Sequence, residues 1–463
     1  MTGLFGVVSK EDCAKTLFYG TDYHTHLGAG YGGLAIWSDK LYRSIHNISQ
    51  AQFKSKFVDE YKEMKGNIGI GVISDRDVQP ITLASQFGTF AIATAGLVEN
   101  ADELAQSLLK KGEAFAEVGE GVINTTELVG RLIVQSDSIV EGIEKALSSI
   151  KGSISLLILA EEGIYAARDE RGRLPLVIGE RGKDIAIASE SCSFSNLGFK
   201  IKKYIQPGET ILATKEGLKT KKGGSGEGKL CAFLWIYTGY PASSYEDVCV
   251  ESVRERCGRA LAKKDNFKAD LVAGVPDSGT AHAIGYAMES KLPFRRPLVK
   301  YSPSWDRSYT PPSQEIRELV AKMKLIPIRE IIDGNRIVLC EDSIVRGTQL
   351  KNLAIQKLWE NGAKEIHLRP ACPPLLYPCK FSLTTRTIQE LVARRAIRAI
   401  EGKDIEDITE YLNPASKKYY QMVEWIRNEL NVTTLRYQTL DDMVEAIGLP
   451  KDKLCLYCWC GEE

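Results

Sequence analysis

Two adjacent acids, Glu341 and Asp342, directly follow the apolar residues 337–340. A short loop then leads to Gly347 and Thr348, after which apolar residues recur at helical spacing. Glycine allows a phosphate to approach the backbone closely, and the N–H groups and dipole of a helix start favour an anion. The Thr348 hydroxyl adds one more donor. The string therefore predicts a phosphate-binding loop at the carboxyl end of a buried strand, where open α/β sheets bind ligands.

The two acids need a different explanation, because a carboxylate repels a phosphate. They can bind sugar hydroxyls, or help a hard cation such as Mg²⁺ to offset a polyphosphate. The acid pair and the loop together predict a phosphorylated sugar as the ligand. For the acid pair alone, an ordinary strand and turn with solvated acids remains the alternative interpretation.

The elements that position this loop belong to the second half of the chain. Residues 270–275 and 337–340 are expected to form buried strands, followed by helices at 280–291 and from Thr348 to about Glu360. Strand–loop–helix units in series predict a parallel, doubly wound sheet. Residues 389–447 are expected to be mostly helical.

The first half mixes short strand-like runs with helical stretches, which predicts an α+β layer structure. The expected strands are residues 68–73, 90–95, 155–159 and 185–188, and the expected helices are residues 101–111 and 139–150. The polar, glycine-rich residues 215–229 are expected to be a linker.

Composition narrows the class of protein. The chain has 463 residues, 44% of them apolar, and 60 basic residues balance 60 acidic ones. Global disorder and a chain-wide basic field for nucleic acid or a membrane surface are therefore excluded. Neither a membrane-spanning run of about 20 apolar residues nor a secretory signal is present, so we expect a cytoplasmic protein of two or three domains. Eleven cysteines then indicate free thiols or metal ligands.

The string from Glu341 to Thr348 resembles the phosphoribosyl diphosphate (PRPP) signature of type I phosphoribosyltransferases. Its form is that of glutamine PRPP amidotransferases, the enzymes that begin purine synthesis. Residues 275–279 resemble the diphosphate loop of this family, and residues 312–325 resemble the mobile loop that closes over PRPP. The resemblance extends from residues 3–6 to the last cysteines. It implies an N-terminal-nucleophile-like αββα domain at 1–230, a type I phosphoribosyltransferase domain at 231–388 and a helical extension at 389–463.

The resemblance also implies a reaction, in which ammonia displaces diphosphate from PRPP to give phosphoribosylamine. The implied PRPP-binding residues are Asp277, Ser278, Gly279, Glu341, Asp342, Ser343, Arg346, Gly347 and Thr348. Glu341 and Asp342 would hold the ribose, and with Ser278 they would bind Mg²⁺. Arg317 and Lys322 are expected to neutralise the leaving group. Residues 300–307 depart from the N-R-Y-V-G-R pattern of the family.

The glutaminase half of the family is altered in this chain. Thr2 replaces the N-terminal cysteine nucleophile, although a terminal threonine can act when its own amine is the base. Ser74 replaces the arginine that grips the glutamine carboxylate, and Ala95 replaces the oxyanion asparagine, which could cost roughly 3–4 kcal/mol. Residues 124–127 replace the S-D-T-E pattern that reads the substrate amine. We therefore expect a retained fold without glutamine hydrolysis. His24 and His26 are interpreted as packing residues.

Four cysteines match the ligand pattern of the iron–sulfur subgroup of the family: Cys231, Cys379, Cys455 and Cys458. The resemblance implies that they hold a [4Fe-4S] cluster, with zinc as the alternative. The other cysteines are interpreted as packing residues, except Cys460, a candidate spare ligand.

Three hypotheses for the function stay open. The first is an enzyme that transfers the phosphoribosyl group of PRPP to ammonia. The ammonia is either free or supplied by a partner protein, and the enzyme is a homodimer or homotetramer. The second is a transferase for another amine in a specialised pathway. The third is a non-catalytic PRPP sensor or scaffold, although a pure scaffold would not need Glu341, Asp342 and Thr348 together.

Overall fold

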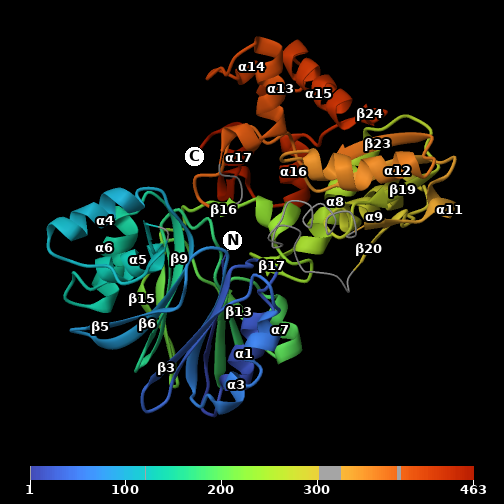
Figure 1. The fold of residues 1–463 in the computed structure, drawn as a ribbon. Helices are drawn as coiled ribbons and strands as arrows, with labels where there is room; N and C mark the ends of the chain where they lie inside the picture. The colour runs from blue at the N-terminus through green and yellow to red at the C-terminus, as the bar shows by residue number, and fades with distance from the viewer. Residues whose placement is uncertain (1, 120, 302–324, 383–386) are drawn as a thin grey trace. The chain divides into compact units, whose positions relative to one another are not determined.

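The computed structural model describes residues 2–119, 121–301, 325–382 and 387–463, which form two compact units (Figure 1). Unit 1 comprises the described residues of Met1–Cys231, Ala242–Asp247 and Lys380–Thr384. Unit 2 comprises those of Ala232–Pro241, Val248–Cys379 and Thr385–Glu463.

Unit 1 is built on two antiparallel sheets. The first has the strand order β13-β11-β12-β1-β4-β2-β3 and the second β15-β14-β10-β9-β6-β5. The strands of the first sheet are β1 (Gly3–Val8), β2 (Tyr31–Trp37), β3 (Leu41–Asn47), β4 (Ile68–Ser74), β11 (Val177–Arg181), β12 (Asp184–Ala188) and β13 (Lys200–Tyr204). Those of the second are β5 (Ile81–Ser85), β6 (Gly88–Val98), β9 (Gly152–Ala160), β10 (Gly163–Arg168), β14 (Thr210–Thr214) and β15 (Gly217–Lys222).

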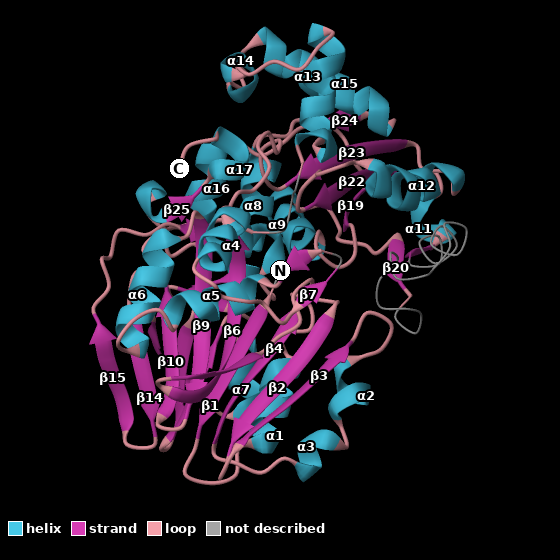
Figure 2. Ribbon diagram, turned by 60° about the vertical axis from the view of Figure 1, so that its left-hand side comes forward, coloured by secondary structure: helices cyan, strands magenta, loops and turns pink. Residues whose placement is uncertain are grey.

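The two sheets pack face to face, and helices cover their outer faces (Figure 2). Between the sheets, Ile70 and Val72 of β4 lie in one core with Leu157 and Leu159 of β9. Helices α1 (Ala14–Asp22), α2 (Phe53–Phe57) and α7 (Cys192–Leu197) cover the first sheet, and α5 (Thr125–Ile133) and α6 (Ile139–Ser149) cover the second. The unit also contains the short helix α3 (Glu60–Glu63), helix α4 (Ala101–Lys110) and the short strands β7 (Val118–Gly119) and β8 (Val122–Ile123). The expected αββα layer order is confirmed.

Glycines on β4 permit close packing of α1. A Cβ atom at Gly71 would lie 1.9 Å from Oγ1 of Thr21, and one at Gly69 would lie 2.7 Å from a methyl group of Leu17. These glycines therefore permit the close approach of the helix to the sheet.

The prediction of a linker at residues 215–229 is wrong in its first half. Residues Gly217–Lys222 form β15, which pairs with β14 through neighbours such as Leu212 and Lys219. An edge strand with exposed lysines lacks the apolar alternation from which a strand is predicted.

Unit 2 is built on a parallel sheet, as the strand–loop–helix pattern predicts. Its order is β19 (Leu271–Gly274), β22 (Arg336–Glu341), β23 (Glu365–Pro370) and β24 (Thr434–Leu435). Helix α9 (Thr280–Ser290) follows β19 and packs against α8 (Val250–Lys263). After β22 comes a π-helical turn, η2 (Leu350–Ile355), and then α12 (Gln356–Glu360). The short strand β24 was not expected, because it interrupts a largely helical stretch.

The segment after residue 389 shares the core of this sheet. Val392 of α13 (Val392–Glu401) and Met422 of α15 (Lys417–Leu430) lie in one apolar cluster with Ile337 and Leu339 of β22. The other helices of the segment are α14 (Thr409–Leu412), α16 (Leu440–Ile447) and α17 (Tyr457–Cys460). The helical extension is thus part of the second unit rather than a separate body.

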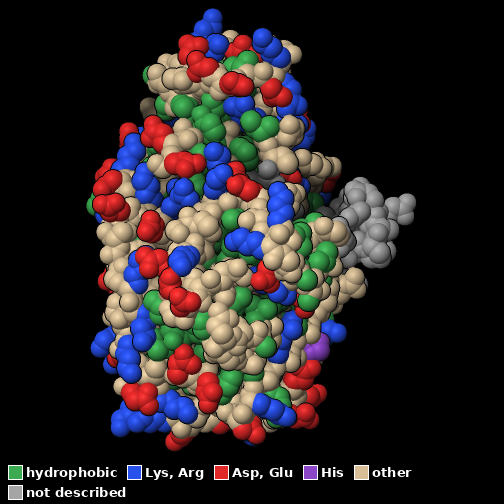
Figure 3. All heavy atoms as spheres, turned by 90° about the vertical axis from the view of Figure 1, so that its left-hand side faces the viewer, with side chains coloured by type: hydrophobic (Ala, Val, Ile, Leu, Met, Phe, Trp, Pro, Cys, Tyr) green, Lys and Arg blue, Asp and Glu red, His purple; other side chains and the backbone are tan. Residues whose placement is uncertain are grey.

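The distribution of charged and apolar residues in the folded chain agrees with the balanced charge of the composition. Basic and acidic side chains are interspersed over the face shown in Figure 3. No helix in the described part of the chain is long and apolar enough to cross a membrane.

Candidate functional site

The two acids at the end of β22 lie close to the loop after β19. Glu341 and Asp342 are buried, with 7% and 4% of their surfaces exposed. The Ser278 hydroxyl donates a hydrogen bond of 3.1 Å to Oε1 of Glu341, and the Ser343 hydroxyl donates one of 2.5 Å to Asp342. Two loops far apart in the sequence therefore converge on one carboxylate pair. Burial and the neighbouring Asp342 carboxylate raise the pKa of Glu341 well above its usual range.

The loop at residues 275–279 passes very close to β22. A Cβ atom at Gly279 would lie 2.3 Å from the carbonyl oxygen of Cys340 and 2.8 Å from the amide nitrogen of Val275. The Val275 N–H donates to the same Cys340 carbonyl at 3.0 Å. Only glycine permits this approach, which holds Ser278 beside the acid pair.

Asp277 has a cationic partner that sequence reasoning missed. Its exposed carboxylate accepts a bond of 3.0 Å from Nζ of Lys300, at the end of β20 (Leu298–Lys300). Lys300 is the first residue of the stretch that departs from the family pattern. A cation at this point would also face a diphosphate bound by the loop, but a lone lysine carries no sequence signal for that place.

The predicted phosphate loop has the expected backbone. Gly347 has a φ of 77°, a conformation that L side chains rarely adopt, and it lies directly before the helical turn of Thr348. Thr348 is exposed, so its hydroxyl and the first N–H groups of the turn are open to an anion. The guanidinium of Arg346 forms an ion pair with Glu390, which sequence reasoning also missed.

The predicted PRPP-binding residues thus lie at or after the ends of two neighbouring parallel strands, β19 and β22, whose loops meet at Ser278 and Glu341. Arg317 and Lys322, which were expected to neutralise the leaving group, lie outside the described residues.

Thr2, Ser74 and Thr125, three of the positions expected to differ from the glutaminase pattern, line a small cavity in unit 1. It measures about 20 Å³, whereas pockets for small organic ligands commonly measure about 300–1,000 Å³. Its walls are formed by Thr2, Ser74, Arg76, Asp77, Gln79, Thr94, Gly96, Leu97, Val98 and Thr125. Such a cavity has room for about one water molecule.

The polar side chains around this cavity form hydrogen bonds and ion pairs with other groups of the protein. The buried Gln79 side chain donates to the carbonyl of Thr94 at 3.2 Å and accepts from its N–H at 2.8 Å. The Thr125 hydroxyl donates to Asp77, which also pairs with Arg76 at 3.5 Å. Gln79 was missed by sequence reasoning, because a single glutamine before a proline is not a recognisable site signal.

Ala95 and Asn124, which were also expected to differ from the glutaminase pattern, have structural roles. Ala95 lies in the apolar core between the sheets, 4% exposed. Asn124 caps α5, since its Oδ1 accepts from the N–H of Thr126 at 2.9 Å and of Glu127 at 3.1 Å. Its Nδ2 donates to the carbonyl of Val78.

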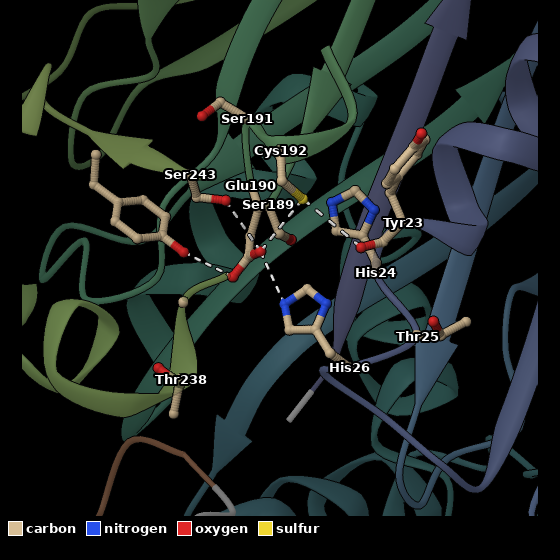
Figure 4. Close-up of polar contacts among 12 residues, drawn as sticks. Tyr23, His24, Thr25, His26, Ser189, Glu190, Ser191, Cys192, Thr238 and Ser243 are labelled. Carbon is tan, nitrogen blue, oxygen red and sulfur yellow. Dashed lines mark hydrogen bonds and ion pairs between the residues drawn. The ribbon is translucent and has the colours of Figure 1, made fainter. Parts of the chain in front are cut away.

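A cluster of polar side chains in unit 1 surrounds Glu190, which is 1% exposed (Figure 4). Its carboxylate binds the Tyr245 hydroxyl at 2.7 Å, the Ser243 hydroxyl at 3.2 Å and Nε2 of His26 at 2.9 Å. Burial alone would raise the pKa of Glu190, but His26 and the hydrogen bonds outweigh it, so this pKa is lowered. The interpretation of His26 as a packing residue is wrong, because it is the charge partner of a buried acid.

Three of the predicted cluster ligands, Cys379, Cys455 and Cys458, lie in unit 2, on segments that backbone hydrogen bonds join. The carbonyl of Cys458 accepts from the N–H groups of Leu376 and Tyr377 at 3.0 and 3.1 Å, two residues before Cys379. The carbonyl of Cys455, in β25 (Leu454–Cys455), accepts from the N–H of Ala232 at 3.2 Å, the residue after Cys231. Within the described residues, no three His, Cys, Asp or Glu side chains are grouped as a metal site.

Comparisons with known proteins cover the whole chain. A family model described as a glutamine amidotransferase domain matches residues 67–196. An amidophosphoribosyltransferase of Methanocaldococcus jannaschii is 32% identical over 100% of this chain and 97% of its own length. One of Bacillus subtilis is 30% identical, over 99% of this chain and 93% of its own length.

Solved structures give the same result for the fold. Glutamine PRPP amidotransferase from B. subtilis, complexed with ADP and GMP, superposes with a TM-score of 0.85 at 30% identity, covering 99% of this chain and 96% of that one. The expected fold, an N-terminal glutamine amidotransferase domain followed by a phosphoribosyltransferase domain, is confirmed. The chain belongs to the amidophosphoribosyltransferase family, whose members are glycosyltransferase-type enzymes.

Proposed function

We propose that this protein transfers the phosphoribosyl group of PRPP to ammonia or another amine, as a step of purine synthesis. The observation that carries the proposal is the hydrogen bond between Ser278 and Glu341, which joins the loops for diphosphate and for phosphoribose at one point. PRPP carries a phosphate at one end and a diphosphate at the other. One PRPP molecule can therefore bind both loops only if the loops lie close together.

Each part of the site has a task in this reaction. The helical turn at Thr348 and the backbone of Gly347 bind the 5′-phosphate, and Asp342 orients the ribose hydroxyls. The loop with Asp277 and Ser278 binds the diphosphate as it leaves through an oxocarbenium-like state. Charge placement and exclusion of water are then the protein's main contributions.

The oxygen donors of Ser278, Glu341 and Asp342 suit Mg²⁺, which prefers carboxylate and hydroxyl oxygens. When bound there with the substrate, the ion would neutralise the charge of the diphosphate. It would also lower the raised pKa of Glu341 by favouring the ionised carboxylate.

We also propose that the first unit no longer hydrolyses glutamine. Thr2 lacks the thiol, Ala95 is packed in the core, and the cavity beside Thr2 is far smaller than a glutamine site. Ammonia would then come from solution or from a partner protein. By resemblance we propose a homodimer or homotetramer, which light scattering of the purified chain tests.

A [4Fe-4S] cluster on Cys231, Cys379, Cys455 and Cys458 is proposed from the resemblance and from the backbone contacts of three of these segments. Four thiolates would hold it, and its task would be to tie the end of the chain to the segments before it. Iron and sulfide analysis of protein purified without oxygen tests this proposal. Iron and sulfide should be lost in Cys458→Ser and kept in Cys249→Ser, whereas zinc without sulfide would overturn it.

The function itself is tested by diphosphate release from Mg·PRPP with ammonium, with glutamine, with a panel of other amines, and with no nitrogen donor. We expect release with ammonium or an amine and none above background with glutamine. Asp342→Asn should abolish release, whereas Asp404→Asn, an exposed change after α13, should not. Release by no donor would overturn the transferase and favour a PRPP sensor.

A further inference from the structure

The chain segment at the start of α13 contacts the phosphate loop through side-chain and backbone bonds. Arg346 carries an exposed guanidinium, with 64% of its side chain accessible, and its Nη2 pairs with Oε1 of Glu390. Glu390 is only 27% accessible and belongs to the short helix η3 (Ile388–Glu390), 44 residues further along the chain. The guanidinium of the pair is therefore exposed to solvent, whereas the carboxylate is largely covered.

Two hydrogen bonds to the loop backbone hold the segment that follows Glu390 against the loop. The N–H of Val392 donates to the carbonyl of Val345 at 2.7 Å, and Nη1 of Arg395 donates to the carbonyl of Arg346 at 3.3 Å. Both bonds come from residues that follow Glu390 within one helical turn or so, and they reach the two residues before Gly347. The position of the Glu390 carboxylate is thus set by the same segment that supports the loop backbone.

A second carboxylate, that of Glu429, forms ion pairs with two cationic side chains near the loop. Oε1 of Glu429, near the end of α15, lies 3.4 Å from Nζ of Lys351 and 3.9 Å from Nη2 of Arg395. With Arg346, three cations thus share two carboxylates beside the phosphate loop. The surplus of positive charge suits a dianionic phosphate, and the carboxylates hold the long side chains in place.

We propose that Glu390 is a positioning residue for the phosphoribosyl transfer, which holds the Arg346 guanidinium at the 5′-phosphate of the sugar substrate. The proposal rests on the function proposed above. A guanidinium has five N–H donors, so the contact of Nη2 with Glu390 leaves donors for a phosphate. A free arginine would lose much rotamer entropy when it binds the phosphate, whereas a held one has lost it already.

The effect should fall on substrate binding rather than on the chemical step, because the 5′-phosphate does not change during the reaction. We expect Glu390→Ala to raise the KM for PRPP about tenfold, the size of one charge-assisted hydrogen bond, with little change in kcat. Glu390→Gln keeps an acceptor oxygen and should recover part of the loss. Asp404→Asn removes the partner of Arg398 on the same helix and serves as the control.

Two product-like inhibitors separate positioning from general damage. Ribose 5-phosphate carries the 5′-phosphate, so its inhibition constant should rise with the KM in Glu390→Ala. Inorganic diphosphate binds the other loop, so its inhibition constant should stay unchanged. If both constants rise together, Glu390 supports the fold of the site and the proposal is wrong.

A double-mutant cycle with Arg346→Ala gives a second, independent test. In the absence of Arg346, removal of the Glu390 carboxylate should have no further effect on the KM for PRPP. An equal effect with and without Arg346 would overturn the proposal while leaving the proposed transferase intact. A wild-type chain that binds neither PRPP nor ribose 5-phosphate would overturn both.

Discussion

The hydroxyl of Ser278 and Oε1 of Glu341 are 3.1 Å apart, although 63 residues separate them in the sequence. This contact joins the ends of β19 and β22, which are neighbours in a parallel sheet. Because parallel strands place their carboxyl ends at one edge, the two loops must meet there. The Glu341 carboxylate at the meeting point is buried beside Asp342, an arrangement that costs stability unless a cation or a proton is bound.

The first prediction concerns this cost. Glu341→Gln should abolish turnover of PRPP and yet raise the melting temperature near neutral pH, by about 2–4 °C per kcal/mol of repulsion removed. The pKa of Glu341 is raised in the folded chain, so the native state binds more protons than the unfolded one above the ordinary pKa of a glutamate. Wild-type stability should therefore fall as the pH rises through the raised pKa, and the variant should lack this fall.

Differential scanning calorimetry from pH 4 to 8, without Mg²⁺, measures the difference. Glu360→Gln, an exposed change on α12, should follow the wild type at every pH. A constant gap between Glu341→Gln and the wild type over this range would show that the pKa of Glu341 is not raised in the folded chain.

A second prediction concerns the glycine that brings the diphosphate loop to β22. Gly279 has a φ of −78°, so alanine meets no backbone strain there, but its Cβ would lie 2.3 Å from the carbonyl of Cys340. Gly279→Ala should cost about 1–3 kcal/mol of unfolding free energy and displace Ser278 from Glu341. Inhibition by diphosphate should weaken. Gly223→Ala, where a Cβ meets nothing within 4 Å, should behave as the wild type in urea unfolding and in inhibition.

The sequence predicted the phosphate-loop site better than its surroundings, for physical reasons. Glu341 and Asp342 stand out because the same string continues to Gly347 and Thr348 at the start of a helix, so that an acid pair and a phosphate loop occur together. Their partner Ser278 was found through a second loop of recognisable chemistry. Glu390 was missed, because its role depends on a contact across 44 residues that no local pattern encodes.

Two other failures have the same origin. Glu190 lies in a serine-rich stretch, and its partners His26 and Tyr245 come from segments that only the folded chain brings together. The polar residues of β15 resemble a linker because the strand lies at a sheet edge, where lysines can remain in solvent. In each case tertiary contacts, rather than local propensity, decide the structure.

A third prediction concerns the proposed loss of glutamine hydrolysis. Thr2→Cys supplies the nucleophile that the family resemblance implies, but Ser74 and Ala95 remain, and the cavity beside residue 2 stays near 20 Å³. We expect no glutamate release from glutamine and an unchanged rate of diphosphate release with ammonium. Glutamate release above the wild-type background would show that nucleophile identity, rather than the closed pocket, limits the first unit.

The last prediction concerns the buried carboxylate of Glu190, which attaches residues 242–247 to unit 1 through Ser243 and Tyr245. Glu190→Gln leaves His26 without its charge partner and should cost about 3 kcal/mol. Hydrogen–deuterium exchange should show faster exchange at residues 242–247. Glu180→Gln removes an exposed pair with Lys202 and should cost less than about 1 kcal/mol.

The pH dependence of this cost has the opposite sign to that of Glu341. The pKa of Glu190 is lowered in the folded chain, so its stabilisation is present above the ordinary pKa of a glutamate and is lost as the pH falls through the lowered value. The difference in unfolding free energy between wild type and Glu190→Gln should therefore shrink on acidification from pH 7 to pH 3. A difference that persists at pH 3 would mean that Glu190 acts through shape and hydrogen bonds rather than through its charge.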